Sequence, residues 1–379
     1  MNEVKLLRFT AEGYRNFAEP ISIDFTDVRN YQFSNECITD GLISKMGIYG
    51  HNGSGKSNLG FALFDIVRLL TDKNIDQGSI SPDIFLNVDK QTSEARFRYE
   101  FRRGLDNITF EYSKTKETEL HSESFSVNDE LLYSYDYEKR EFMTLQKDKI
   151  NAANLNFEYL QNGLSILRYI ANNTPLQDDS FIKAVMDFVS HMLWFRHIPD
   201  NGYIGLETGS SSLDDWIIAN GLVGDFSQFI RDVCGLDITL DIVTVNDVTG
   251  PKRILVEKHN NGLLSFGLVA SNGTRAAELF YFWKKRFDNV SLLFMDEFDA
   301  YYHHTLALNI ISILKEYPSI QAIFTTHNTA LLGNSVLRPD CYMILSNGKL
   351  RSFADSAEGR ELREGHNLEK IYRNGGIDG

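Results

Sequence analysis

Residues 50–57 read Gly-His-Asn-Gly-Ser-Gly-Lys-Ser, and this segment limits the possible folds more than any other part of the sequence. It satisfies the phosphate-loop pattern G-x-x-x-x-G-K-[ST] in full. The apolar segment from Leu42 to Gly50 predicts a buried strand before the loop, and a helical pattern follows from Ser57 to about Leu70. In this order of strand, loop and helix, backbone N–H groups and a helix N-terminus point at a bound phosphate.

The residues of this loop have different expected roles in binding ATP and Mg²⁺. The glycines let the backbone approach the phosphates closely. Lys56 supplies a positive charge to the β- and γ-phosphates, and the Ser57 hydroxyl is expected to ligate Mg²⁺. The expected nucleotide contacts in this region are Gly50, His51, Asn52, Gly53, Ser54, Gly55, Lys56, Ser57 and Asn58.

A second candidate element lies in the last third of the chain, where the apolar run Val290–Met295 is followed by Asp296 and Glu297. Such a strand end suits a Walker B site, because it holds the first carboxylate near the metal and the second beside the attacking water. We expect Asp296 to serve Mg²⁺, directly or through water, and Glu297 to be the general base or to orient the water. Alone, an Asp-Glu strand end is often a capped loop, but a complete phosphate loop in the same chain favours catalysis.

A third candidate element is the segment AIFTTHN, which places Thr325, Thr326 and His327 at the end of the next expected strand. A histidine there can hydrogen-bond the γ-phosphate or the attacking water. A lone histidine at a strand end would more often be structural. His327, however, follows the Asp-Glu pair in the order that a catalytic role requires.

In combination, these elements resemble ABC-type ATPases outside transporters: the SMC, RecF and RecN class and, more closely, the OLD-like and abortive-infection ATPases of bacteria. In that class a signature loop from one subunit reaches the γ-phosphate bound by the other. The segment Ser271-Asn272-Gly273-Thr274 is similar to that loop, which implies that Ser271, Gly273 and Thr274 contact nucleotide. The segment has only one of the two glycines found in transporters, and a serine before a helix is also an ordinary N-cap.

Further matches extend the resemblance in patches. Tyr14-Arg15-Asn16-Phe17 resembles the N-terminal [FY]-R-x-F pattern, which implies that Arg15 and Asn16 lie near the nucleotide. Residues 298–303 stand in the place of the D-loop and of the L-H-P motif of OLD-like proteins, with His304 in place of proline. His303 and His304 as a metal pair is the weaker alternative, and Gln91 is a candidate for the Q-loop glutamine.

The resemblance implies a homodimer or higher homo-oligomer in which two copies enclose two ATP molecules in composite sites. Hydrolysis in such proteins acts as a timer or switch for conformation.

The pattern of elements predicts an α/β P-loop NTPase with a mixed sheet, an antiparallel β subdomain and a helical insert in the signature lobe. We expect an N-terminal ATPase lobe in residues 1–150, with antiparallel strands between Ala95 and Leu145. Residues 151–265 are expected to form a mainly helical insert, with helical spacing up to Leu236 and strands after Ile238. Residues 266–379 are expected to form the C-terminal ATPase lobe with the signature loop, Walker B, D-loop and His327.

Charge and composition narrow the possible partners. The net charge of −14 argues against a surface that is wholly a nucleic-acid footprint, although DNA at a local basic patch stays possible. No apolar stretch suggests a signal peptide or a membrane span, so we expect a cytoplasmic protein without membrane contact. Cys37, Cys234 and Cys341 lie far apart in sequence and predict buried thiols. The basic groups that could make a patch are Arg96, Arg98, Arg102 and Arg103, or Lys284, Lys285 and Arg286, though a solvated face is favoured.

The sequence shows no effector chemistry. After Thr326 only about fifty residues remain, too few for the toprim nuclease domain of OLD-family nucleases. We therefore favour an ATPase that controls a separately encoded effector, a nuclease or toxin, in bacterial anti-phage defence. The alternative is a RecF/SMC-like DNA-binding ATPase in repair or maintenance. A transporter subunit and a P-loop kinase fit the motifs less well.

Overall fold

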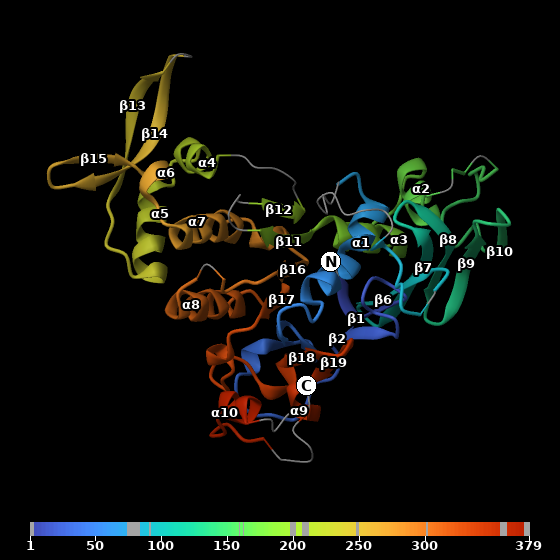
Figure 1. The fold of residues 1–379 in the computed structure, drawn as a ribbon. Helices are drawn as coiled ribbons and strands as arrows, with labels where there is room; N and C mark the ends of the chain where they lie inside the picture. The colour runs from blue at the N-terminus through green and yellow to red at the C-terminus, as the bar shows by residue number, and fades with distance from the viewer. Residues whose placement is uncertain are drawn as a thin grey trace.

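A seven-stranded mixed sheet forms the centre of the molecule, in the order β12-β11-β16-β17-β5-β18-β19 (Figure 1). Its inner strands are parallel, and β12 (Gly202–Gly205) and β19 (Lys349–Ser352) are antiparallel edges. The inner strands are β11 (Met192–His197), β16 (Leu292–Met295), β17 (Gln321–Thr326), β5 (Lys45–Tyr49) and β18 (Tyr342–Ser346). The computed structural model describes residues 4–73, 84–90, 92–158, 160–161, 163–197, 202–206, 212–247, 250–300, 302–356 and 362–374.

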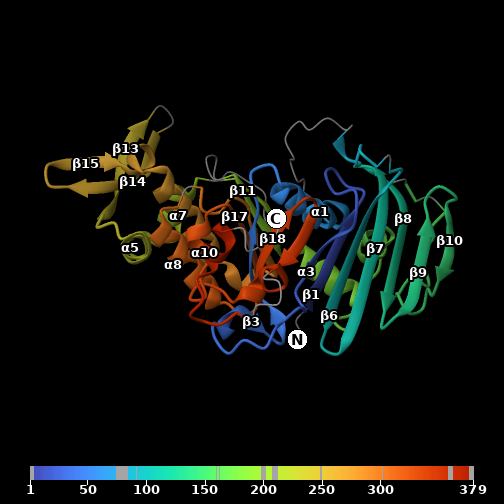
Figure 2. The ribbon, with the colours of Figure 1, turned by 60° about the horizontal axis from the view of Figure 1, so that its bottom comes forward.

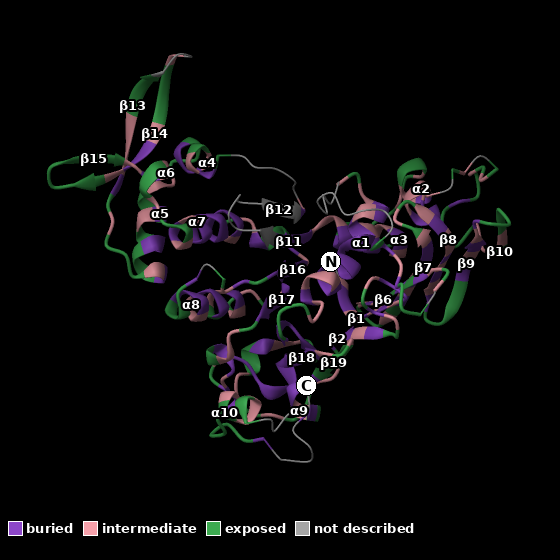
Figure 3. Cartoon of the chain, viewed as in Figure 1, coloured by how far each residue is buried: buried purple, intermediate pink, exposed green. Residues whose placement is uncertain are grey.

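The strands β5, β16 and β17 are buried along their whole length, because helices cover the sheet. Figure 3 shows buried residues concentrated in this sheet and in α1 (Lys56–Leu70). The helix α1 lies close against β11 and β16: a Cβ at Gly60 would stand 2.7 Å from the Phe294 ring and 3.0 Å from Trp194. The absence of a side chain at Gly60 therefore lets the helix after the phosphate loop pack directly on the sheet.

A second sheet of seven antiparallel strands, in the order β10-β9-β8-β7-β6-β1-β2, forms the other side of the molecule (Figure 2). It confirms the predicted antiparallel subdomain. Turns at Gly104-Leu105 and Asn128-Asp129 join β6 to β7 and β8 to β9. Burial alternates along β6, as expected where one face is covered. The strands are β1 (Val4–Glu12), β2 (Ile21–Asp24), β6 (Ala95–Arg103), β7 (Asp106–Lys116), β8 (Glu119–Val127), β9 (Glu130–Asp136) and β10 (Glu141–Leu145).

The segment 151–265 contains strands of the central sheet as well as the predicted helices. The apolar run that begins at Phe181 is a helix up to Ser190 and then forms the strand β11 from Met192, so the helical spacing read from this run corresponds to a helix only in its first part. A short apolar run does not reveal whether it is a buried helix or a buried strand. The helices are α2 (Ile166–Asn173), α3 (Phe181–Ser190), α4 (Leu213–Ala219) and α5 (Val223–Phe229).

The strands expected after Ile238 form a small antiparallel sheet of β13 (Leu240–Asp247), β14 (Gly250–His259) and β15 (Gly262–Ser265). This sheet projects from the end of the molecule that carries α4, α5 and α6 (Phe266–Val269), and much of it is exposed (Figures 1 and 3). The division of the chain into three lobes at 150 and 265 stays a prediction.

The last third of the chain has the predicted alternation of helix and strand. It contains α7 (Asn272–Lys284), β16, α8 (His304–Lys315), β17 and β18, and two short helices follow, α9 (Phe353–Ser356) and α10 (Leu368–Arg373). Cys37 and Cys341 are buried, Cys234 is partly buried, and all three are free thiols. Within the described ranges, every helix is too short or too polar to span a bilayer.

Candidate functional site

The loop of residues 50–57 joins the carboxyl end of β5 to the first turn of α1. Gly53 and Gly55 have positive φ angles of 79° and 105°, which favour glycine. Gly50 is required for a different reason, because a Cβ there would lie 2.6 Å from Ser54 Oγ and 2.8 Å from the carbonyl oxygen of Leu345. The sequence motif is therefore matched by a backbone that only these glycines allow.

Lys56 is folded back over this loop. Its Nζ donates hydrogen bonds to the carbonyl oxygens of Gly50 at 2.8 Å and His51 at 3.1 Å. Burial lowers the pKa of Lys56, and the nearby carboxylates of Asp296, Glu297 and Asp299 oppose that shift. The lysine of the phosphate loop and the acidic residues after β16 thus lie within electrostatic reach of one another.

In the loop itself, Ser54 Oγ is buried without a hydrogen-bond partner among the described residues. Buried polar groups in proteins are almost always paired, so an unpaired hydroxyl in a loop of this shape fits a missing polar ligand. The first turn of α1 contains no acidic residue, which also suits an anion. The residues present therefore fit a phosphate group, with Ser57 in the first turn of the helix.

Arg15 and Asn16 lie against the loop, where the resemblance placed them. Arg15 Nη1 donates to Asn58 Oδ1 at 2.9 Å, and its guanidinium lies 4.4 Å from the centre of the Phe61 ring. Asn58 Nδ2 donates to Asn16 Oδ1 at 2.7 Å, and Asn16 Nδ2 makes a long contact of 3.4 Å with the Ser54 carbonyl oxygen. Arg15, Asn16 and Asn58 thus form a polar wall beside the loop.

Asp296 and Glu297 follow β16 at the same edge of the central sheet. The strand pairings set Thr326 beside Tyr49 and Met295 beside Phe324, so the ends of β5, β16 and β17 lie together. Asp296 is buried, and its Oδ1 accepts a hydrogen bond from Thr325 Oγ1 at 2.6 Å. Glu297 is exposed and has a φ of 46°, unusual for a residue with a side chain.

His327 is the first residue after β17, and its side chain is exposed. Because Thr326 pairs with Tyr49, His327 stands level with Gly50, the first residue of the phosphate loop. The central sheet therefore brings together the three motifs that the sequence predicted: the loop, the Asp-Glu pair and the histidine.

Within a single chain, the signature-like loop lies away from this site. Ser271 is the N-cap of α7, and its Oγ accepts from the Thr274 N–H at 3.2 Å, so the ordinary capping role is present. Ser271 is exposed, Gly273 is half-buried and Thr274 is buried. The start of α7 lies beside α6 and the β13–β15 sheet, whereas α1 lies beyond the central strands (Figures 1 and 2).

The segment after Glu297 packs between the sheet and α7. The Phe298 ring lies 5.2 Å from that of Phe324, and Tyr302 Oη donates to the Ala276 carbonyl oxygen at 3.3 Å. His303 and His304 are exposed at the start of α8, and the described residues hold no group of three metal-ligating side chains. Tyr301 and Gln91, the candidate Q-loop residue, lie outside the described residues.

Sequence reasoning overlooked two residues at this edge. Asp299 contributes charge near Lys56, and Thr325 bonds both acidic positions. Asp299 stood inside the D-loop match without a role of its own. Only the hydrogen bonds of the folded chain, which the sequence does not reveal, show that the hydroxyl of Thr325 rather than that of Thr326 reaches the end of β16.

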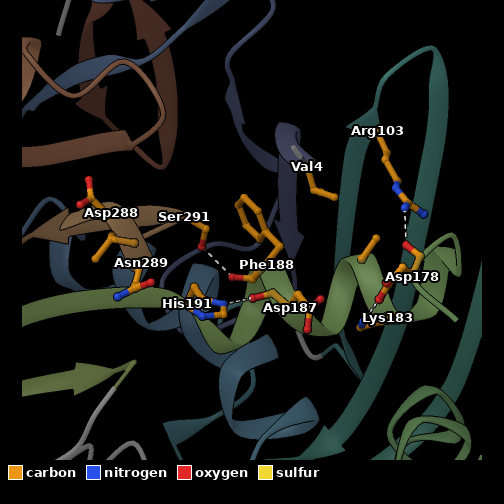
Figure 4. Close-up of a pocket in the computed structure, with 12 residues that line it drawn as sticks. Val4, Arg103, Asp178, Lys183, Asp187, Phe188, His191, Asp288, Asn289 and Ser291 are labelled. Carbon is orange, nitrogen blue, oxygen red and sulfur yellow. Dashed lines mark hydrogen bonds and ion pairs between the residues drawn. The ribbon is translucent and has the colours of Figure 1, made fainter. Parts of the chain in front are cut away.

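A separate cavity of about 520 Å³ lies at the amino end of β16, away from these loops (Figure 4). Its walls come from α3, from Val290 and Ser291 ahead of β16, and from Arg103 at the end of β6. The Arg103 guanidinium donates to the main-chain oxygens of Asp178 and Asp179, both at 2.6 Å. The described residues that line this cavity include none of the predicted site residues.

The basic side chains of the two candidate patches contact other groups of the same chain. Arg98 pairs with Glu100 and Glu111, and Lys285 pairs with Asp225 at 2.7 Å. Arg286 lies 3.8 Å above the Phe282 ring. The remaining partners are Glu94 for Arg96, the Asp40 carbonyl oxygen for Arg102 and the Phe229 ring for Lys284.

Solved structures with a similar course of the chain share little sequence identity with it. The SMC head bound to the C-winged helix domain of ScpA is 14% identical with a TM-score of 0.47, covering 92% of this chain and 96% of that chain. The SMC head domain from Thermotoga maritima is 16% identical with a TM-score of 0.43, covering 91% of this chain and 97% of that chain. The recombination mediator protein RecF with ATP is 13% identical with a TM-score of 0.40, covering 92% of this chain and 99% of that chain.

A search of curated proteins gave no match. Residues 45–333 match the profile of a family described as "AAA domain, putative AbiEii toxin, Type IV TA system". The matched stretch is about three quarters of the chain and contains the phosphate loop, the signature-like loop, the Asp-Glu pair and His327. The chain therefore belongs to this family of AAA domains.

Proposed function

We propose that this protein binds and hydrolyses ATP at the edge of the central sheet. The observation that carries the proposal is the meeting of a complete phosphate loop with Asp296 and Glu297, close enough for their charges to act on Lys56. Backbone N–H groups of the loop and Lys56 would hold the phosphates, and Arg15 and Asn16 would support the loop from the side. His51, Asn52 and Asn58 complete the proposed nucleotide contacts.

Ser57 and Asp296 would hold Mg²⁺, which neutralises phosphate charge when it is bound. Glu297 would take a proton from the attacking water or orient it, and its exposed side chain can reach solvent from the strand end. His327, level with the start of the loop, would hydrogen-bond the γ-phosphate or the water. Glu297 and His327 are thus the proposed catalytic residues.

The complete site on this proposal needs a second copy of the chain. Ser271, Gly273 and Thr274 lie at the start of α7, beside α6 and the β13–β15 sheet and across the central strands from α1, so they would reach the phosphate loop of a partner rather than their own. A homodimer with two composite sites satisfies this requirement, and ATP would hold it closed. Hydrolysis of ATP would then allow the dimer to open.

The proposed role of this cycle is control of a separately encoded effector, a nuclease or toxin, in anti-phage defence in the bacterial cytoplasm. The family description names a toxin of a type IV toxin–antitoxin system, which supports a role in such a system. The alternative, a RecF/SMC-like DNA-binding ATPase, is less well supported, because Arg96, Arg98 and Lys285 of the basic groups considered above are paired with carboxylates within the chain.

The proposal is tested on the full chain by phosphate release and by light scattering with and without ATP and Mg²⁺. We expect metal-dependent hydrolysis and a change from monomer to dimer with ATP. Lys56→Ala is expected to abolish ATP binding, and exposed Lys349→Ala serves as the matched surface control. Equal ATP binding by Lys56→Ala and the wild type would reject the site. Co-purification with neighbouring gene products, with and without ATP, tests the effector.

A further inference from the structure

Thr325, a fully buried residue of β17, makes three hydrogen bonds to the consecutive residues that end the neighbouring strand. Its hydroxyl donates to Asp296 Oδ1 at 2.6 Å and accepts from the Glu297 N–H at 2.8 Å. Its carbonyl oxygen accepts from the Phe298 N–H at 3.1 Å. Thr325 therefore stabilises the turn that contains Asp296 and Glu297 through three hydrogen bonds.

The bond to Glu297 has a specific consequence for the backbone. A φ of 46° lies in the left-handed region, which is costly for any residue with a side chain and persists only when surrounding contacts enforce it. The Thr325 hydroxyl and carbonyl hold the N–H groups of Glu297 and Phe298, on both sides of the Glu297 Cα. Without these bonds the peptide is free to relax and to swing the exposed carboxylate away from the loop.

The bond to Asp296 fixes the other carboxylate. With Oδ1 bound to a buried hydroxyl, the rotation of the Asp296 carboxyl group is set, and its second oxygen is directed elsewhere. Hydrogen-bonding partners behind a metal ligand orient that ligand, and their loss commonly weakens metal binding or activity by about 10- to 100-fold. A single hydroxyl thus acts on both the proposed metal ligand and the proposed catalytic base.

We infer that Thr325 is a positioning residue for ATP hydrolysis, which sets Asp296 toward the metal and Glu297 toward the attacking water. This inference rests on the proposed function of the same site. Thr325 touches neither metal nor water on this account, and it acts only through its two acidic neighbours.

The next residue provides a matched control. Thr326 is equally buried and also bears a bonded hydroxyl, but this hydroxyl accepts from the Asn328 N–H at 2.9 Å. Successive side chains of a strand point to opposite faces, so the Thr326 hydroxyl cannot serve the end of β16. Replacing each threonine with valine removes a hydroxyl at constant shape, and only the variant at 325 is expected to alter catalysis.

The test compares the full chain with Thr325→Val, Thr325→Ser and Thr326→Val. Phosphate release is measured against Mg²⁺ concentration, and Mn²⁺ binding with a non-hydrolysable ATP analogue is measured by electron paramagnetic resonance. For Thr325→Val we expect a rate about 10- to 100-fold lower and a metal requirement about 10-fold higher. Thr325→Ser and Thr326→Val are expected to stay within about threefold of the wild type, since the first retains the bonds and the second leaves them intact.

A Thr325→Val protein with the wild-type rate and wild-type metal requirement would overturn the inference, as would an equal loss in Thr325→Ser. If circular dichroism shows that Thr325→Val is unfolded, Thr325→Ala takes its place in the same comparison with serine. A wild-type chain that hydrolyses no ATP defeats the proposed function instead. Mn²⁺ binding still reports the orientation of Asp296 in that case, so the two failures are distinguishable.

Discussion

Glu297 combines an exposed carboxylate with a backbone that is held in a strained conformation. Strain of this kind recurs at functional sites, where it directs a reactive group. The sequence identified Glu297 through its place after an apolar strand, but it contained no sign of the φ angle. That angle depends on the neighbouring strand, which arrives later in the chain.

The first prediction concerns Glu297→Gln. This change removes the base but keeps the shape, so we expect ATP binding to persist while hydrolysis falls by about 10²- to 10⁴-fold. An ATP-bound dimer should then accumulate, and light scattering will detect it. Glu316→Gln, at an exposed position just after α8, is the control. Normal turnover by the Glu297 variant would remove this residue from the catalytic role.

Glu278 offers a prediction about pH. Burial, reinforced by the Asp214 carboxyl group and opposed by Arg275, raises its pKa to about 8. The folded state therefore holds a proton that the unfolded chain releases at lower pH, so this group makes the protein less stable as pH rises from about 4.5 to 8. We expect the urea midpoint of the wild type to fall across that range, and Glu278→Gln to lose this component. Identical pH profiles of the two proteins would contradict the assignment.

At the scale of elements, a buried ion pair ties α1 to the antiparallel sheet. Lys114 Nζ, on β7, donates to Asp65 Oδ2 at 2.6 Å, and Tyr112 Oη donates to the same oxygen at 2.8 Å. Both charged side chains are almost fully buried. The helix that begins at the phosphate loop is therefore fixed to the second sheet as well as to the first.

Lys114→Met is expected to destabilise the fold by about 3–5 kcal/mol, because it leaves the Asp65 carboxylate buried and unpaired. Denaturant unfolding followed by circular dichroism will measure the change. Asp65→Leu combined with Lys114→Met should recover part of the loss, since no lone charge remains. Lys116→Met, in an exposed pair with Glu119 on the same hairpin, should cost less than about 1 kcal/mol. A small effect at Lys114 would show that the pair contributes little.

The elements also show where sequence reasoning succeeded. The phosphate loop, α7, α8, β16 and β17 were predictable, because apolar periodicity and motif agree in each of them. The boundary between α3 and β11 was not, since the apolar run continues through His191 without a glycine or proline. The helix and the strand on the two sides of this boundary are apolar for different reasons. The helix α3 packs through one face, whereas β11 is enclosed by the sheet and by α1.

At the scale of the whole molecule, the two halves of the proposed composite site, the phosphate loop and the start of α7, lie on different sides of the central strands. The sequence predicted this requirement only through resemblance, because spacing along the chain does not reveal distance in space. The pairing of β11 with β16 was likewise unpredictable, since strand order in a parallel sheet depends on long connections.

The last prediction is that Ser271→Arg leaves nucleotide binding by the monomer intact but blocks ATP-dependent dimerisation. A long cation at this exposed helix start would occupy the space that the partner's phosphate loop needs. Loss of the N-cap costs about 0.5–2 kcal/mol by itself, so Ser212→Arg, at the N-cap of α4, is the matched control. Unaltered dimerisation of Ser271→Arg in light scattering would remove the signature role.

The position of β5 between β17 and β18 has a consequence for synthesis on the ribosome. Both neighbours of this strand are encoded in the last fifth of the chain, so residues 45–49 emerge on the order of tens of seconds before their partners. During that interval the apolar strand that precedes the phosphate loop has no lateral pairing and exposes its edges. The sheet around the phosphate loop can therefore form only after β17 and β18 have been synthesised, although the loop itself is made near the beginning.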